Sequence, residues 1–138
     1  MALIDRVKKN EGFKSHPYTD SVGKLTIGYG FNIAPDGDGL AEDESEAVLK
    51  IKLAKTAAAV VKALPWTNKL DEVRFEVLVE MAYNMGVAGL LGFHRMLAMA
   101  EAGNFEGAAA AGLESKWATQ VGDRAKVLME ILRTGVEQ

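Results

Sequence analysis

The chain has 138 residues, of which 49% are hydrophobic and 25% are charged, and its net charge at pH 7 is −3. This length and composition favour one folded domain and exclude a disordered chain, while the acidic charge argues against sequence-independent binding to nucleic acid. The sequence contains no cysteine, which excludes disulfides, thiolate metal sites and cysteine nucleophiles.

The N-terminal third of the sequence predicts a short helix followed by a β-hairpin. Apolar residues recur at helical spacing from Leu3, and Gly12 is a stop signal, so we expect a helix from about residue 2 to about residue 11. Residues 16–19 and 24–28 flank a polar, glycine-containing connection at 20–23, which is typical of an antiparallel hairpin. The glycines that follow, up to residue 39, predict turns.

The remaining sequence predicts helices. A long helix is expected over residues 42–64, with acidic residues in its first turn and Pro65 at its end. Asn68 is the predicted cap of a second long helix that stops at Gly86. Shorter helices are expected at about 88–92, 94–102, 104–112 and 123–134, separated by glycines.

These elements predict an α+β fold that is mainly α-helical. We expect a single domain over residues 1–138, with a small hairpin-containing lobe at about 12–45 and a helical lobe at about 65–138, joined by the long helix. A cleft between such lobes is the natural place for a ligand.

Two acidic residues near the predicted hairpin are candidates for general acid and base chemistry. Glu11 ends the first helix, where the helix dipole and partial burial would both favour its protonated form. Asp20 lies in a polar turn, where backbone amides would keep it ionised. Hydrolysis of a glycosidic bond needs such a pair, and Thr26 on the opposite strand could help to hold a water molecule. The alternative is that both acids are solvated surface groups.

The order of Glu11, Asp20 and Thr26, followed by IGYG, resembles the catalytic signature of the T-even-phage-type lysozymes, a family of phage endolysins. Further segments resemble the C-terminal lobe of this family in the same order: AYNMG at 82–86, GF at 92–93, SKW at 115–117, DRAK at 123–126 and RTG at 133–135. The resemblance covers nearly the whole chain.

This resemblance implies a lysozyme-like fold and hydrolysis of the β-1,4 bond between N-acetylmuramic acid and N-acetylglucosamine in peptidoglycan. Glu11 would be the general acid, Asp20 would position or activate water, and Thr26 would help to hold that water. The family pattern implies inversion of configuration, for which the two carboxyls stand roughly 6.5 to 9.5 Å apart.

Other positions match the family cleft more loosely. The substrate-binding residues implied by the resemblance are Tyr18, Gly30, Tyr83, Asn84 and Lys116. For the two tyrosines, packing in the core is the alternative interpretation. Arg124 matches an arginine that pairs with the catalytic glutamate across the cleft, and the alternative is a surface arginine near a helix N-terminus.

The sequence also departs from the family pattern. Phe31 stands where a histidine is common, which removes an ion pair but no catalytic group. The segment between Gly30 and the long helix is short, which predicts the loss of a hairpin and of some sugar subsites. The acidic net charge argues against strong adsorption to anionic cell walls.

Three other motifs do not meet the requirements of a metal or dinucleotide site. The DGDG at 36–39 lacks the remaining ligands of an EF-hand, and GYG at 28–30 lacks the third glycine and βαβ setting of a dinucleotide loop. His16 and His94 form no metal-binding pair. The sequence therefore predicts an enzyme without metal or cofactor.

The expected partner is bacterial peptidoglycan, and we expect a monomer without stable membrane insertion, because no apolar run is long enough to span a bilayer. The charged N-terminus resembles no signal peptide, which predicts synthesis in the host cytoplasm. The family resemblance implies that a holin-type membrane protein then opens the inner membrane. Two alternatives stay open: a lytic transglycosylase, which forms an anhydro-sugar without water, and a cell-wall-binding protein without activity.

Overall fold

Seven α-helices and a small antiparallel sheet make up residues 2–138, the part of the chain that the computed structural model describes. The predicted α+β, mainly helical fold class is confirmed. The chain divides into two units, of which the first ends at Leu49 and the second begins at Lys50.

The N-terminal unit begins with helix α1 (Leu3–Glu11), as predicted. The helix ends because Gly12 takes a φ of 70° and donates its N–H to the Lys8 carbonyl at 2.9 Å. Lys8 and Lys9 lie in its last turn, where positive charge suits the negative end of the helix dipole. This geometry places Glu11 at the last helical position.

The sheet of this unit has the strand order β1-β2-β3. Strands β1 (Lys14–Thr19) and β2 (Leu25–Gly28) form the predicted hairpin, in which Tyr18 lies opposite Thr26. Strand β3 (Phe31–Asn32) pairs with β2 and was not predicted, because two residues between glycine turns carry no readable strand pattern.

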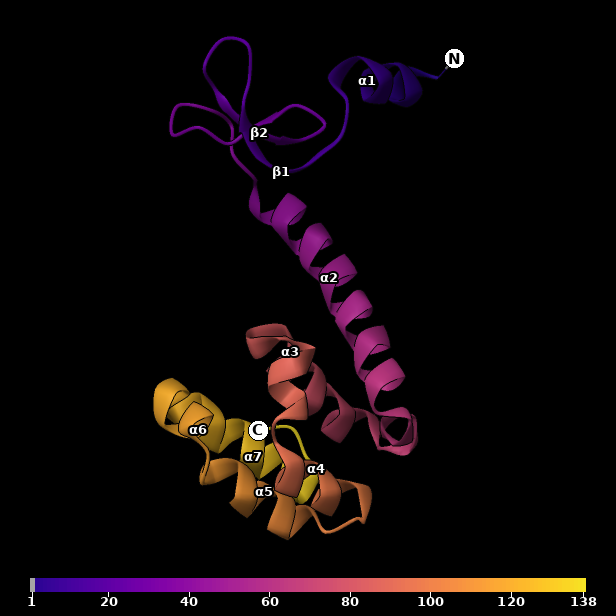
Figure 1. Ribbon diagram of the computed structural model, residues 1–138, viewed down its shortest axis with the longest axis vertical. Helices are drawn as coiled ribbons and strands as arrows, with labels where there is room; N and C mark the ends of the chain where they lie inside the picture. The colour runs from indigo at the N-terminus through magenta and orange to yellow at the C-terminus, as the bar shows by residue number, and fades with distance from the viewer. Residues whose placement is uncertain (1) are drawn as a thin grey trace. The chain divides into compact units, whose positions relative to one another are not determined.

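Helix α2 (Glu42–Ala63) follows, in good agreement with the predicted 42–64, and Figure 1 shows it as one long continuous helix. Glu42, Asp43 and Glu44 occupy its first turn, where negative charge is favourable. Pro65 then begins the 3₁₀ helix η1 (Pro65–Lys69).

Helix α3 (Glu72–Leu91) differs from the prediction at both ends. Asn68 lies inside η1, and the cap is instead Asp71, whose side chain accepts a hydrogen bond from the Arg74 N–H at 3.1 Å. Gly86 does not stop the helix. It takes φ 82° and ψ 158°, so it kinks α3 and the predicted helix at 88–92 is the end of α3.

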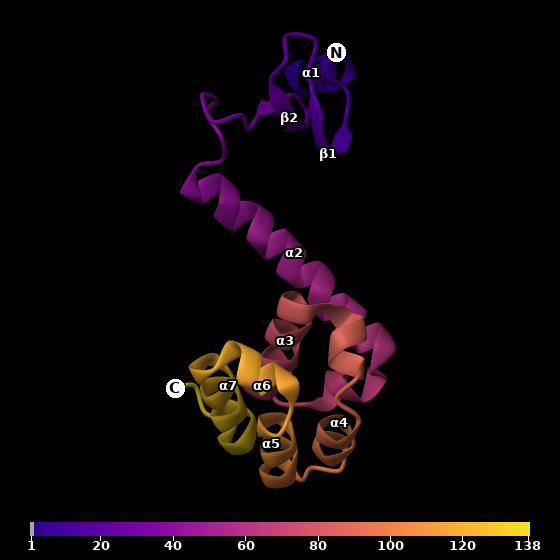
Figure 2. The same cartoon turned by 60° about the vertical axis from the view of Figure 1, so that its left-hand side comes forward.

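The other helices are α4 (His94–Glu101), α5 (Phe105–Leu113), α6 (Lys116–Val121) and α7 (Asp123–Thr134). Figure 2 shows α3 to α7 gathered into one bundle. Helix α6 was predicted as a connection. The Ser115 hydroxyl caps it by accepting a hydrogen bond from the Ala118 N–H at 3.2 Å.

The hydrophobic core of the described residues lies in the C-terminal unit, between Val60 and Leu132. Methionines help to fill it: Met81, Met96 and Met129 are buried, and Gly112 leaves room for the Met129 sulfur. Within the described N-terminal unit, Thr26 is the one buried residue. Across residues 2–138, no helix combines the length and apolarity that crossing a bilayer requires.

Candidate active site

Glu11 is held against the turn between β2 and β3. A Cβ atom added at Gly30 would lie only 2.3 Å from Oε2 of Glu11, so the carboxyl group occupies the space that any other side chain would need. Gly30 also has a φ of +80°, which side chains other than glycine rarely adopt. The structure therefore brings the predicted site residues Glu11 and Gly30 together. The absence of a side chain at Gly30 makes room for the Glu11 carboxyl.

Asp20 lies in the turn that joins β1 to β2. Its Oδ1 accepts hydrogen bonds from the backbone N–H groups of Val22 at 3.0 Å and Lys24 at 2.8 Å. Backbone donors to a carboxylate fix its orientation. Because both contacts use Oδ1, Oδ2 is left to bind another group.

Thr26 lies on β2 and only 3% of its surface is exposed. Its hydroxyl donates to the Lys24 carbonyl at 3.0 Å, and the Asp20 N–H donates to the same carbonyl at 2.8 Å. The hydroxyl oxygen keeps lone pairs that can accept a hydrogen bond from water. Asp20 and Thr26 are thus both fixed on the backbone of one residue, Lys24.

Tyr18 shares a face of the sheet with Thr26, because the two residues are direct cross-strand partners. Its ring is half-buried, and the Lys14 ammonium lies 6.0 Å from the ring centre.

In the C-terminal unit, three predicted substrate-binding residues lie on or near α3 and α6. Tyr83 is 46% exposed, which excludes full burial in the core within its unit. Asn84 accepts a hydrogen bond from Nε1 of the buried Trp117 at 3.4 Å, and Lys116 is the exposed neighbour of that tryptophan.

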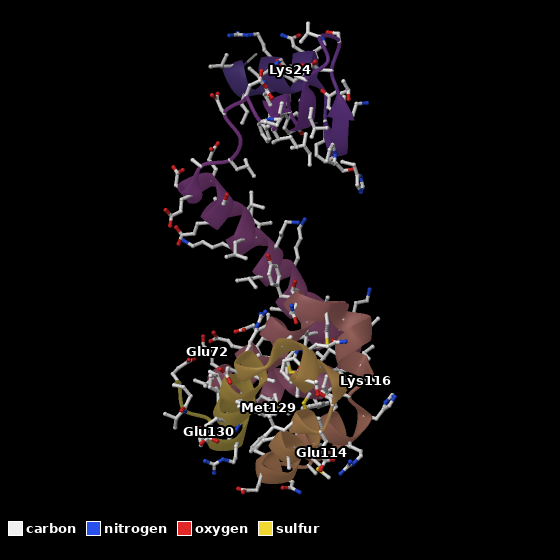
Figure 3. All side chains as sticks on the ribbon, turned by 90° about the vertical axis from the view of Figure 1, so that its left-hand side faces the viewer. Lys24, Glu72, Glu114, Lys116, Met129 and Glu130 are labelled. Atoms are coloured by element: carbon white, nitrogen blue, oxygen red, sulfur yellow. The ribbon has the colours of Figure 1, made fainter. Side chains whose placement is uncertain are left out.

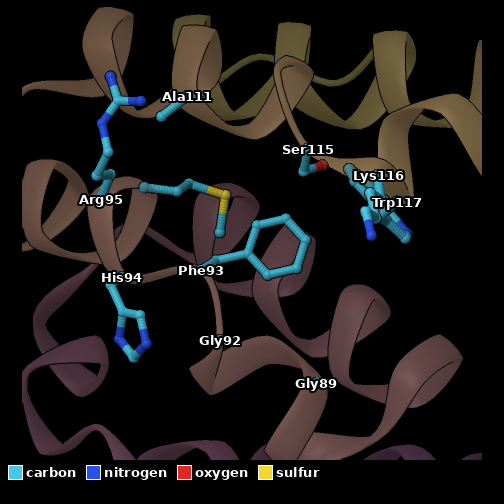
Figure 4. A pocket seen from close by; sticks show the side chains of 10 residues that line it. Gly89, Gly92, Phe93, His94, Arg95, Ala111, Ser115, Lys116 and Trp117 are labelled. Atoms are coloured by element: carbon cyan, nitrogen blue, oxygen red, sulfur yellow. The ribbon is translucent and has the colours of Figure 1, made fainter.

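Lys116 and Trp117 line a pocket of about 460 Å³. Figure 4 shows the Phe93 ring at its centre, with Lys116 and Trp117 on one side and His94 and Arg95 on the other. The Phe93 ring meets the Trp117 ring edge to face, with 5.8 Å between the ring centres. The charged groups that line the pocket are cationic, and Arg95 forms an exposed ion pair with Glu114 at 3.1 Å.

Arg124 forms an ion pair in its own unit. Its guanidinium lies 3.2 Å from Oε2 of Glu80, and both side chains are nearly half exposed. The expected pairing of Arg124 with Glu11 stays a prediction. To pair with Glu11, Arg124 would have to give up its ion pair with Glu80.

In the N-terminal unit, the Glu11 carboxyl lies against Gly30, and Asp20 and Thr26 are both anchored on the backbone of Lys24. Residues 2–138 contain no group of three or more histidine or acidic side chains that could hold a metal ion. The chemistry that these residues can supply is general acid and base catalysis.

The chain matches the Phage lysozyme family over residues 8–133. This match, together with the α+β fold and the acidic residues around the hairpin, defines the class of protein as a lysozyme-type glycoside hydrolase. The chain belongs to the phage lysozyme family.

Two relatives illustrate this membership. The chain is 26% identical over 161 aligned positions to the pre-baseplate central spike protein Gp5 of Enterobacteria phage T4, which covers 98% of the chain and 28% of that protein. It is 24% identical over 167 positions to the probable T4-type lysozyme 2 of Dictyostelium discoideum, which covers 97% of the chain and 95% of that protein. The chain thus spans about a quarter of the spike protein and nearly all of the second relative.

Proposed function

We propose that the chain hydrolyses the β-1,4 bond between N-acetylmuramic acid and N-acetylglucosamine in bacterial peptidoglycan. Glu11 is the general acid, Asp20 activates a water molecule, and Thr26 helps to hold that water. The observation that carries this proposal is the shared anchoring of Asp20 and Thr26 on Lys24, on the hairpin next to the glutamate that contacts Gly30.

In this mechanism, Glu11 donates its proton to the glycosidic oxygen while the bond to the sugar carbon breaks. Water donates one hydrogen bond to Oδ2 of Asp20, transfers that proton to it and attacks the same carbon. The two N–H groups on Oδ1 support this role, because they fix the carboxylate without occupying its other oxygen. Attack by water on the face opposite the leaving group gives inversion.

We assign substrate contacts to Tyr18 and Gly30 in the N-terminal unit and to Tyr83, Asn84 and Lys116 in the C-terminal unit. The exposure of Tyr83 and Lys116 supports this assignment. We also propose that Arg124 pairs with Glu11, as the family resemblance implies.

The central test compares the wild type with Glu11→Gln on bacterial cells whose outer membrane has been permeabilised. We expect clearing of the cell suspension to fall by more than about 100-fold, because the amide cannot protonate the leaving group. Glu101→Gln is the matched control, since Glu101 is an exposed glutamate on α4, and it should clear cells at the wild-type rate. Equal clearing by wild type and Glu11→Gln would contradict the assignment.

The products distinguish hydrolysis from transglycosylation. Mass analysis of the released muropeptides should show reducing ends, whereas a dominance of anhydro-sugars would mean that water is not the acceptor. Proton NMR at early times should show the α-anomer if the reaction inverts configuration at the β-linked carbon.

We further propose that the chain acts as a monomeric endolysin that reaches the wall after a holin-type protein permeabilises the inner membrane. Family membership supports this route. Expression in bacteria should leave cells intact until a holin is co-expressed, and lysis by the chain alone would contradict the dependence.

A further inference from the structure

We propose that Lys24 and Asp36 are positioning residues for the water-activating pair, Asp20 and Thr26. The inference rests on the proposed function and extends it to two residues that touch neither substrate nor water. Lys24 and Asp36 form an ion pair between Nζ and Oδ2 that connects the β1–β2 turn to the loop after β3. Figure 3 labels Lys24 at this turn.

The backbone of Lys24 makes every contact that links Asp20 to Thr26. Its N–H donates to Oδ1 of Asp20 at 2.8 Å, and its carbonyl accepts from the Asp20 N–H at 2.8 Å and from the Thr26 hydroxyl at 3.0 Å. A rotation of this one residue would therefore move the carboxylate and the hydroxyl relative to each other. The separation of the two groups sets where water is held.

Apart from the hydrogen bonds among Asp20, Val22 and Lys24, the middle of the turn is open to solvent. Ser21, Val22 and Gly23 are all exposed, and Gly23 has a φ of +85° with no atom near the position of a side chain. The turn makes one further backbone contact, from the Gly23 N–H to the Asp20 carbonyl at 3.1 Å. The ion pair of the Lys24 side chain adds an anchor outside the turn.

The other end of the ion pair is such an anchor. Asp36 lies inside a tight turn in which the Gly37 N–H donates to the Ala34 carbonyl at 2.9 Å. Asn32 supports the turn, since its Oδ1 accepts from the Ala34 N–H at 3.0 Å and fills the space beside Gly37, where a Cβ would lie 2.4 Å away. The Ile33 N–H fastens the start of this loop to the Leu25 carbonyl at 2.9 Å.

The ordered turn that carries Asp36 distinguishes this ion pair from an ordinary surface ion pair. The side chains are 40% and 65% exposed, and exposed pairs usually contribute little because holding two flexible side chains costs entropy. Here the loop already fixes the backbone of Asp36, so the short aspartate side chain loses little further freedom and the lysine side chain carries most of the ordering. We therefore expect the pair to act on the geometry of the site more than on global stability.

The experiment uses the full chain and soluble, uncross-linked peptidoglycan strands, with kcat and KM measured by release of reducing ends. Lys24→Met and Asp36→Asn should each lower kcat by roughly three- to fivefold and leave KM within about twofold. The charge-reversed double variant Lys24→Glu with Asp36→Lys should recover most of kcat. Glu106→Gln, which breaks an ion pair of similar exposure between Glu106 and Arg133, should leave both constants unchanged.

A second measurement follows the turn directly by hydrogen exchange of the Val22 and Lys24 amides. Exchange at both should quicken by roughly three- to fivefold in Lys24→Met, while thermal unfolding of the whole chain changes little. A wild-type kcat in both single variants, or a loss that charge reversal fails to restore, would overturn this inference alone. An inactive wild type would instead overturn the proposed function, and the positioning role would fall with it.

Discussion

Gly30 is the residue whose identity the structure constrains most directly, because the Glu11 carboxyl occupies the place of its missing side chain. Gly30→Ala should therefore displace the carboxyl and lower the rate of cell clearing by about 100-fold or more. The positive φ adds a loss of stability of about 1 kcal/mol, to be measured by chemical unfolding.

Gly103→Ala is the matched control for this prediction. Gly103 has nearly the same φ, +81°, but no atom lies within 4 Å of the position of its Cβ. Gly103→Ala should lose about as much stability as Gly30→Ala but keep the wild-type rate of cell clearing. Equal activities of the two variants would show that contact with Glu11 does not matter.

At the level of single residues, the sequence indicated the candidate site side chains but not the backbone groups that position them. Glu11, Asp20 and Thr26 could be named because their types and spacing indicate chemistry. Lys24 could not be named, since its N–H and C=O would be present in almost any residue. The ion pair of Arg124 with Glu80 was also missed, because nothing in the sequence pairs positions 44 residues apart.

The helices of the C-terminal unit are joined at Arg74 on α3. Its Nε donates to the Leu132 carbonyl at 2.7 Å and its Nη2 to the Arg133 carbonyl at 2.9 Å, while the guanidinium stacks 3.7 Å from the centre of the Phe105 ring. These contacts satisfy carbonyls at the C-terminal end of α7, where positive charge is also favourable. One side chain thus connects α3, α5 and α7.

Arg74→Ala should lower the free energy of unfolding by about 2 to 3 kcal/mol, because two charge-assisted hydrogen bonds and a cation–π contact are lost. Urea titration measures this change. The free energy of unfolding of Arg74→Lys should lie between those of the wild type and Arg74→Ala, since lysine keeps the charge but not the planar guanidinium. A loss below about 0.5 kcal/mol for alanine would contradict the role of Arg74.

A pH-dependent contribution to stability is expected on α7. The hydrogen bond from the Arg133 side chain, aided by its charge, holds the pKa of Glu130 below its usual value against an opposing effect of desolvation. A depressed folded pKa means that this stabilisation is present above the unfolded value and is lost as the pH falls through the folded one. Figure 3 shows Glu130 on α7.

Glu130→Gln should therefore be less stable than the wild type at pH 7, and the difference should shrink below about pH 4.5, the ordinary value for this carboxyl. Urea unfolding at pH 7 and at pH 3 measures it. In an Arg133→Gln background the same substitution should have no pH-dependent effect. A difference that grows on acidification would have the wrong sign.

The sequence predicted long, periodic elements well and short ones poorly. Helix α2 and the β1–β2 hairpin agree closely with expectation because periodicity, caps and turn residues all coincide. Helix α6 and strand β3 are too short for a periodic pattern. The start of α3 was misplaced because Asn68 and Asp71 are both good caps, and only the fold reveals that Pro65 begins a separate turn of helix.

For the molecule as a whole, burial is unequal between the two units. The described hydrophobic core comes from Val60 onward, while Thr26 is the buried residue of the N-terminal unit. Amides of α3, α5 and α7 should therefore exchange with deuterium only on global unfolding, and those of the β1–β2 hairpin at least about tenfold faster. Mass spectrometry resolved by peptide tests this, and uniform exchange would contradict it.

The use of Lys24 as a backbone support has a consequence for protein engineering. Proline is the one amino acid that cannot supply an N–H at this position, so a library of all substitutions at residue 24 should divide sharply between proline and the rest. Among the other variants, kcat should depend on how well the side chain at position 36 pairs with the new side chain at position 24. The two codons are therefore best randomised together.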